Sequence, residues 1–210
     1  MADRVPLDFD PPVRQLRSLL LGIDEDELTD PTPCGGWTVA ALLVHIIGFS
    51  WAFAEAGKKL TGAPGTAGPP PQPDPADLPQ HWRSRMPVQL EELAAAWRDP
   101  AAWTGTSQAG GATMPATTIG CFAMNELVVH SWDLARATGQ DYAVDPRILA
   151  PLIELLSQGP SGGTPGMFGP VVEIDDEASL LDQAVSLAGR DPHWRPDRRD
   201  LSTPSTSAAE

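Results

Sequence analysis

One segment, residues 115–138, constrains the fold most, because it combines a strong helical repeat with charged residues on its apolar side. At about 100° per residue, Glu126, His130 and Asp133 fall within about 60° of the apolar stripe formed by Ile119, Phe122, Ala123, Leu134 and Ala137. Burying an unpaired charged group costs several kcal/mol, so these three side chains need partners. The segment therefore predicts a long helix with a buried polar site.

A second helix is predicted where the longest apolar run, residues 39–54, surrounds His45. Thr38 is a favourable N-cap for this helix, which should continue to about Lys59. The run of 16 residues is shorter than the roughly 20 needed to span a bilayer. We therefore expect a buried helix whose imidazole also needs partners for its two nitrogens.

If these two helices pack together, His45, Glu126 and His130 converge. Glu126 and His130 are one helical turn apart, a spacing from which two side chains can hold one ion. Two imidazoles and a carboxylate with an open position suit Zn²⁺ and resemble catalytic more than structural zinc sites. Asp133 is expected to orient a ligand imidazole rather than to bind the ion. A buried polar network without metal is the alternative interpretation of the same residues.

The remaining segments predict an all-α fold. Apolar residues recur at helical spacing over residues 10–22, 81–97 and 146–157, which gives four or five helices in all. Pro87 either bends the helix over 81–97 or begins a second one. The Gly-rich stretch 104–113 is expected to form a short irregular hairpin. An all-α bundle with the two polar-site helices at its centre is the favoured architecture.

The domain organisation follows from composition. Seven prolines within residues 61–79 predict an exposed loop. Residues 171–174 resemble a short strand, and a helix is expected to follow through Leu187. We predict a metal-binding helical bundle over residues 1–158, a strand-helix extension over residues 159–195 and a disordered tail over residues 196–210.

Charge and cysteine content narrow the partners. The net charge of −14 repels both a phosphate backbone and an anionic lipid surface, so neither nucleic acid nor membrane is an expected partner. Cys34 and Cys121 cannot form a disulfide framework, and no export signal is visible near Met1, so the cytoplasm is the expected compartment. The two cysteines also lack the close spacing of zinc ligands. Trp51 and Trp132 are candidates for lining a pocket.

Three segments resemble the mycothiol-dependent maleylpyruvate isomerase branch of the DinB/YfiT-like metal-binding bundles, namely PCGGWTVAALLVHIIG (33–48), NELVVHSWDLARATG (125–139) and FGPVVEIDDEASLLDQAVSLAGRDPHW (168–194). The resemblance covers nearly the whole chain apart from the loop near residues 60–80. It implies a four-helix bundle that holds a divalent metal, commonly zinc. The family's ligands are the His of a GWxxxxLLxH helix and the Glu and His of an ELxxHxWD helix, which correspond to His45, Glu126 and His130.

The resemblance also implies a chemistry, in which the metal activates the low-molecular-weight thiol mycothiol for attack on an electrophile. A metal-bound thiol is deprotonated at neutral pH. The isomerase itself has a substantial C-terminal domain with basic substrate-binding residues, whereas about 40 residues follow the Gly-rich loop here. Maleylpyruvate isomerisation itself is therefore disfavoured. The candidate anion contacts in this part of the chain are Arg190, Arg195, Arg198 and Arg199.

Two functional hypotheses from different classes follow. The first is a metal- and mycothiol-dependent transferase or isomerase-like enzyme, a monomer or homodimer, that acts on a small electrophile. The second is a non-catalytic metal-binding or scaffold bundle, in which the ion only stabilises the fold.

Overall fold

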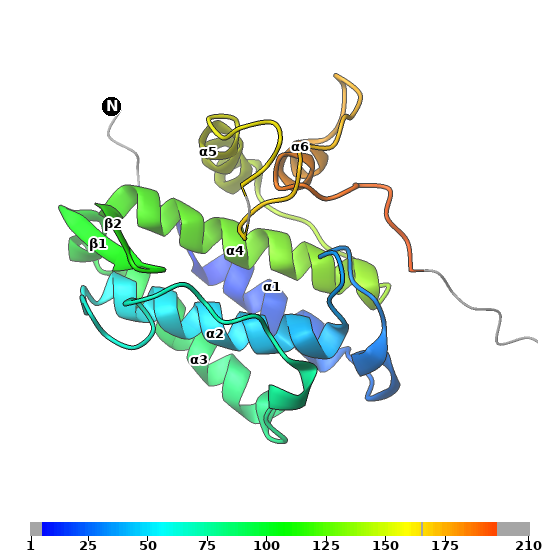
Figure 1. Ribbon diagram of the computed structural model, residues 1–210, viewed down its shortest axis with the longest axis horizontal. Coiled ribbons are helices and arrows are strands. Elements are labelled where there is room, and N and C mark those ends of the chain that lie inside the picture. Colours follow the sequence, from blue (N-terminus) through cyan, green and yellow to red (C-terminus); the bar gives the residue numbers. More distant parts are fainter. Residues whose placement is uncertain (1–5, 165, 197–210) are drawn as a thin grey trace, which may run out of the picture.

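A computed structural model describes residues 6–164 and 166–196. Apart from residue 196, the predicted disordered tail lies outside the described residues, as do Arg198 and Arg199. The described chain is mostly helical with one small sheet (Figure 1). Its elements are α1 (Asp10–Leu21), η1 (Asp26–Thr29), α2 (Val39–Gly57), η2 (Pro75–Asp77), α3 (Trp82–Arg98), η3 (Pro100–Trp103), β1 (Thr106–Ala109), β2 (Ala112–Pro115), α4 (Ala116–Ala137), α5 (Pro146–Leu156) and α6 (Leu180–Leu187). The expected all-α class is confirmed at this level.

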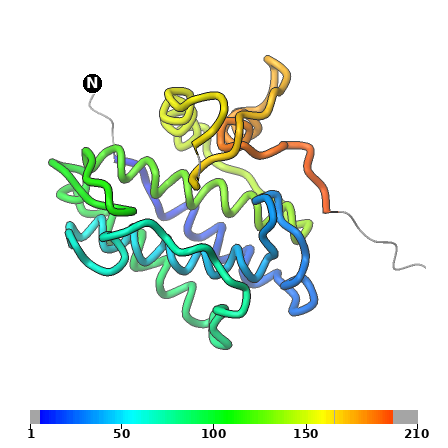
Figure 2. The backbone as a smooth tube through the Cα atoms, in the orientation of Figure 1, coloured from blue at the N-terminus to red at the C-terminus, as the bar shows by residue number. Residues whose placement is uncertain are grey.

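Helices α1 to α4 pack side by side (Figure 1), and their buried apolar side chains, together with some from α5, form the main hydrophobic core. Helix α2 packs against α3 and α4, and α1 packs against the same two helices. Leucines at helical spacing fill the interior, among them the fully buried Leu16, Leu42, Leu90 and Leu127. Helices α5 and α6 pack on each other, and α5 also packs against α4 (Figure 2). Helix α4 therefore has neighbours on several sides, which explains why most of its residues are buried.

Helix α2 is the buried helix that the apolar run predicts. The Thr38 hydroxyl caps it by accepting a hydrogen bond from the amide of Ala41 at 3.3 Å. The helix has 19 residues and a mean hydropathy of 1.7, so its length and composition alone would allow it to cross a membrane. However, 56% of the 18-residue stretch that has this mean hydropathy is buried within the fold. It is thus packing against α3 and α4, rather than length, that marks α2 as a core helix.

The hairpin before α4 is regular. Strands β1 and β2 pair antiparallel from Thr106 opposite Pro115 to Ala109 opposite Ala112. Gly110 and Gly111 join them, both with positive φ, as the tightest hairpin turns require. Pairing continues to Pro115, so the following helix begins at Ala116.

Pro87 lies inside α3, a single helix from Trp82 to Arg98, so the alternative of a second helix is excluded.

The predicted strand at residues 171–174 is wrong. These residues carry no strand assignment in the described structure. The Val171 amide donates to the carbonyl of Ser161, and the Val172 amide donates to the carbonyl of Ser186 at the end of α6. The local sequence predicted a strand here, but the backbone groups find partners in a loop and a helix end instead of a neighbouring strand. The helix that follows, α6, is confirmed and ends at Leu187 as expected.

Candidate metal centre

Helices α2 and α4 bring the three predicted ligands together. His45 projects from α2, while Glu126 and His130 project from successive turns of α4. The Nε2 atom of His45 lies 3.0 Å from Oε2 of Glu126, and Nε2 of His130 lies 3.2 Å from the same oxygen. One ligand-type atom from each residue lies within 4.8 Å of the others. Packing of α2 on α4 thus produces the convergence that the sequence predicts.

Asp133 determines which nitrogen of His130 faces Glu126. Its Oδ2 lies 2.9 Å from Nδ1 of His130, and an ionised carboxylate can only accept, so the imidazole proton lies on Nδ1. A neutral His130 then presents a lone pair at Nε2 to the carboxylate oxygen of Glu126. Two acceptors 3.2 Å apart attract each other only when a proton or a metal cation lies between them. Asp133 therefore occupies the expected orienting position.

Burial and hydrogen bonds act in opposite directions on these groups. Burial alone would raise the pKa of Glu126, but hydrogen bonds with His130 and His45 outweigh it and hold that pKa well below its usual range. Burial would lower the pKa of His130, but its bonds to Asp133 and Glu126 raise it. The pKa of Asp133 is lowered because the Arg190 charge and the His130 bond outweigh burial. Both carboxylates are thus ionised, which is the form that binds cations.

Aromatic rings surround the two imidazoles. The ring centre of Trp37 lies 4.9 Å from that of His45, and the ring of Phe49 packs edge-on against His45 at 5.7 Å. Both aromatic rings also lie 6.0 Å from His130. Glu126 keeps 22% of its side chain exposed, against 13% for His45 and 7% for His130. The site is therefore closed around its imidazoles and accessible mainly at the carboxylate.

The aromatic rings that contact the two imidazoles in the described structure belong to Trp37 and Phe49, and the two tryptophans proposed as pocket residues lie elsewhere. Trp51 is 44% exposed on α2. Trp132 is buried, with the guanidinium of Arg136 5.3 Å from its ring centre. Trp37 lies immediately before the N-cap Thr38, and its contact with His45 depends on how the loop before α2 folds back.

A second layer of polar contacts surrounds Asp133. Arg190, from the segment just after α6, approaches Oδ2 of Asp133 with Nη2 at 3.1 Å and Oδ1 with Nε at 3.3 Å. Nη1 of Arg190 donates to the carbonyl of Ala188 at 2.8 Å. Arg190 was predicted to be a candidate anion contact. The structure buries it, and the anion it contacts is a carboxylate of its own chain.

Cys34 joins the same layer. Its sulfur lies 3.3 Å from Nη2 of Arg190, and it forms a potential ligand group with His130 and Asp133, all within 4.8 Å. Burial raises the pKa of the Cys34 thiol to about 12, although the Arg190 charge acts in the opposite direction. Sequence spacing gave no signal for this proximity, since the contact between Cys34 and Arg190 spans 156 residues.

The donor set fits a divalent cation. Two imidazole nitrogens and a carboxylate are ligands that suit zinc, and His130 has the carboxylate partner on its second nitrogen that metal-binding histidines commonly have.

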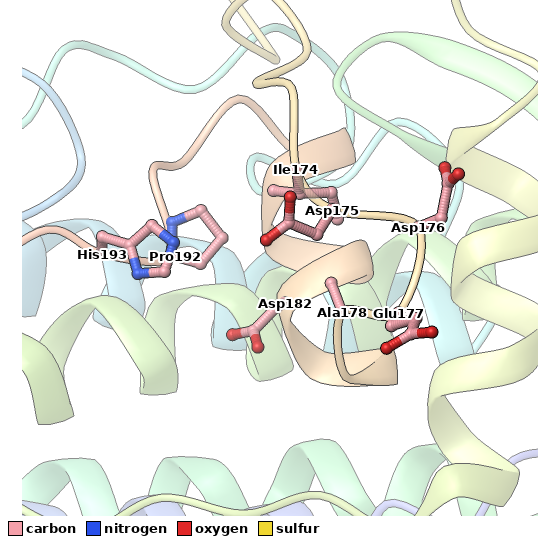
Figure 3. Close-up of a pocket in the computed structure, with 8 residues that line it drawn as sticks. All are labelled: Ile174, Asp175, Asp176, Glu177, Ala178, Asp182, Pro192 and His193. Carbon is pink, nitrogen blue, oxygen red and sulfur yellow. The ribbon is translucent and has the colours of Figure 1, made fainter.

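Elsewhere, a hollow of about 340 Å³ lies beside α6 (Figure 3). Its titratable lining residues are Asp175, Asp176, Glu177, Asp182 and His193. It is separate from the candidate metal centre, because the lining includes none of the three predicted ligands.

Comparison with known proteins identifies the family of this chain. Residues 9–135, more than half of the chain, match the family described as the mycothiol maleylpyruvate isomerase N-terminal domain. Two uncharacterized proteins of Mycobacterium tuberculosis, Rv0738 and MT0763, are each 28% identical over 181 residues, covering 82% of this chain and 90% of the relative.

Two crystal structures of the mycothiol-dependent maleylpyruvate isomerase, one of a point mutant, are also similar. Their TM-scores are 0.57 and 0.56 at 20% and 21% identity. The matches cover 72% and 70% of this chain and 69% and 66% of the isomerase chains. At this identity the likeness establishes the fold. The family match, by contrast, runs from α1 through most of α4 and includes all three candidate ligands. The chain belongs to the mycothiol maleylpyruvate isomerase N-terminal domain family.

Proposed function

We propose that this protein is a divalent-metal-binding enzyme that uses mycothiol in a transferase- or isomerase-type reaction on a small electrophile. The four packed helices would then be a DinB/YfiT-like bundle. Family membership supports the thiol, and the similar isomerase structures support the fold. The observation that carries the metal is the approach of two imidazole Nε2 atoms to one carboxylate oxygen, at 3.0 and 3.2 Å.

The ligands in this proposal are His45, Glu126 and His130, and Zn²⁺ is the ion that their chemistry favours. When bound, the ion would supply the positive charge that keeps a thiol deprotonated at neutral pH.

The chain's own residues have three tasks in this proposal. Asp133 holds the proton of His130 on Nδ1, so that Nε2 remains a ligand. Trp37 and Phe49 cover the imidazoles and limit the access of water. The partly exposed Glu126 marks the side from which a small thiol can enter. A thiol pKa of about 12 keeps Cys34 protonated at neutral pH, so Cys34 is a poor nucleophile beside a small-molecule thiol bound at the site. A reducing cytoplasm would keep that thiol available.

The alternative is a metal-binding or scaffold bundle in which the ion is structural. The extent of the hydrophobic core argues against it, because α1 to α4 bury many apolar side chains against one another, and this packing does not require an ion. A bundle with its own core should fold before it binds metal, whereas a structural site supplies folding free energy.

Metal analysis of purified, tag-free protein after zinc reconstitution tests this proposal. We expect close to one zinc ion per chain in the wild type and in His81→Ala, whose exposed histidine lies outside the site. Glu126→Gln, which keeps the size of the side chain but not its charge, should lose the metal. Retention of full stoichiometry in Glu126→Gln would reject this ligand set.

Circular dichroism on the chelator-treated wild type then separates the two functions. If the metal is catalytic, the metal-free protein should remain folded. Unfolding on chelation would favour a structural role for the metal.

A further inference from the structure

We propose that Arg190 is a positioning residue of the metal centre. It holds Asp133 in place, and Asp133 in turn fixes the orientation of His130. This inference rests on the proposed function, because it requires that His45, Glu126 and His130 bind a metal. It extends that function by making the C-terminal extension a part of the site.

Both carboxylate oxygens of Asp133 have polar partners. Oδ2 accepts from Nδ1 of His130 at 2.9 Å and from Nη2 of Arg190 at 3.1 Å, while Oδ1 faces Nε of Arg190 at 3.3 Å. The guanidinium therefore contacts both oxygens, which fixes the plane of the carboxylate. Without Arg190, the carboxylate could rotate, and His130 would lose a fixed acceptor for its Nδ1 proton.

Both members of this ion pair are buried. Asp133 is fully buried, and Arg190 is 8% exposed. A buried carboxylate needs a compensating charge, and the ion pair with Arg190 spans 57 residues of sequence. This pairing differs from an exposed surface ion pair, which holds its side chains only loosely and contributes little.

Arg190 is itself held in place by backbone carbonyls of its own segment. Its amide donates to the carbonyl of Val185 at 2.9 Å, and its Nη1 donates to the carbonyl of Ala188 at 2.8 Å. The preceding Gly189 has a φ of 80°, and a Cβ there would lie 2.7 Å from the backbone of Gly169. The extension thus reaches Asp133 through a backbone approach that requires glycine.

Arg190 also contacts the loop before α2. Nη2 of Arg190 also lies 3.3 Å from the sulfur of Cys34. Cys34 is three residues before Trp37, whose ring covers His45. One guanidinium therefore connects the C-terminal extension, α4 and the loop that covers the site.

Arg136 provides a matched control. It also joins α4 to the C-terminal segment, because its Nη2 donates to the carbonyl of Pro192 at 2.7 Å. Its guanidinium also lies over the ring of Trp132, and among the described residues no hydrogen bond joins it to Asp133. It therefore anchors the segment independently of Asp133. Substituting Arg136 should loosen the extension while leaving the contacts around His130 in place.

The test uses full-length protein loaded with Co²⁺, whose visible absorption reports on its ligands. We expect Arg190→Met to weaken cobalt affinity by roughly tenfold or more and to change the visible spectrum, as removal of outer partners of metal ligands commonly does. Arg136→Met should keep wild-type affinity and spectrum. In an Asp133→Asn background, Arg190→Met should cause little further loss, because Arg190 acts through Asp133.

Wild-type affinity and spectrum in a folded Arg190→Met protein would overturn the inference. If Arg190→Met fails to fold, Arg190→Lys keeps the charge but cannot contact both carboxylate oxygens. A changed cobalt spectrum in Arg190→Lys supports positioning, and an unchanged one rejects it. Equal losses in Arg136→Met and Arg190→Met would also reject it, since docking of the extension alone would then explain both. Failure of the wild type to bind cobalt would instead contradict the proposed function.

Discussion

The polar residues around the candidate metal centre come from segments that lie far apart in the sequence. His45, Glu126 and His130 stand out because ionisable side chains on apolar helix faces need partners, and the structure brings them together. Cys34 and Arg190 could not be found in this way. Their contacts span 156 and 57 residues and depend on how a loop and the C-terminal extension fold back onto α4. Local periodicity carries no information about such contacts.

The Cys34 thiol gives a prediction at this scale. Its pKa is raised to about 12 by burial, above the usual value of about 8.5. The thiolate fraction should therefore rise about tenfold per pH unit throughout pH 7 to 10. We expect the rate of alkylation of Cys34 to rise without a plateau in this range, as followed by mass spectrometry. Cys34→Ala serves as the control for any reaction at Cys121. A plateau near pH 8 to 9 would contradict the account, because Cys34 could then act as the nucleophile itself.

At the level of elements, the helices follow from residues within each segment. Apolar repeats and the Thr38 cap predicted α2 and α4, because such signals are local. The strand predicted at residues 171–174 does not form, because a strand needs a neighbouring strand to pair with. A local sequence pattern does not show whether such a neighbour is present. The two short strands that do form, β1 and β2, are adjacent in sequence and are joined by a Gly-Gly turn.

Two helix glycines give a matched pair of predictions. A Cβ on Gly120 of α4 would lie 2.5 Å from the ring of Trp103 and 2.8 Å from that of Trp97. Gly120→Ala should therefore lower the free energy of unfolding by about 1 to 3 kcal/mol. The exposed Gly48 of α2 has nothing within 4 Å of such a Cβ, so Gly48→Ala should raise it by roughly 0.5 to 1 kcal/mol. Urea unfolding measures both, and changes of the same sign would contradict the described packing.

For the whole molecule, the central point is that two distant parts of the chain meet at one site. The bundle supplies the three candidate ligands and the apolar core. The extension supplies Arg190, which reaches Asp133 from beyond α6. The sequence predicted the bundle and the existence of an extension. It did not predict that Arg190 reaches Asp133, because that contact depends on α6 packing on α5 and on the close approach of Gly189 to Gly169.

The central claim is that the bundle holds a metal which in turn binds an external thiol, and titration of cobalt-loaded protein with mycothiol tests it most directly. If the bound cobalt takes up the thiolate, a new near-ultraviolet thiolate-to-cobalt absorption band should appear and saturate at one mycothiol per chain. Mycothiol disulfide, which has no free thiol, should not produce it. A cobalt-loaded protein whose spectrum is unchanged by saturating mycothiol would contradict the account.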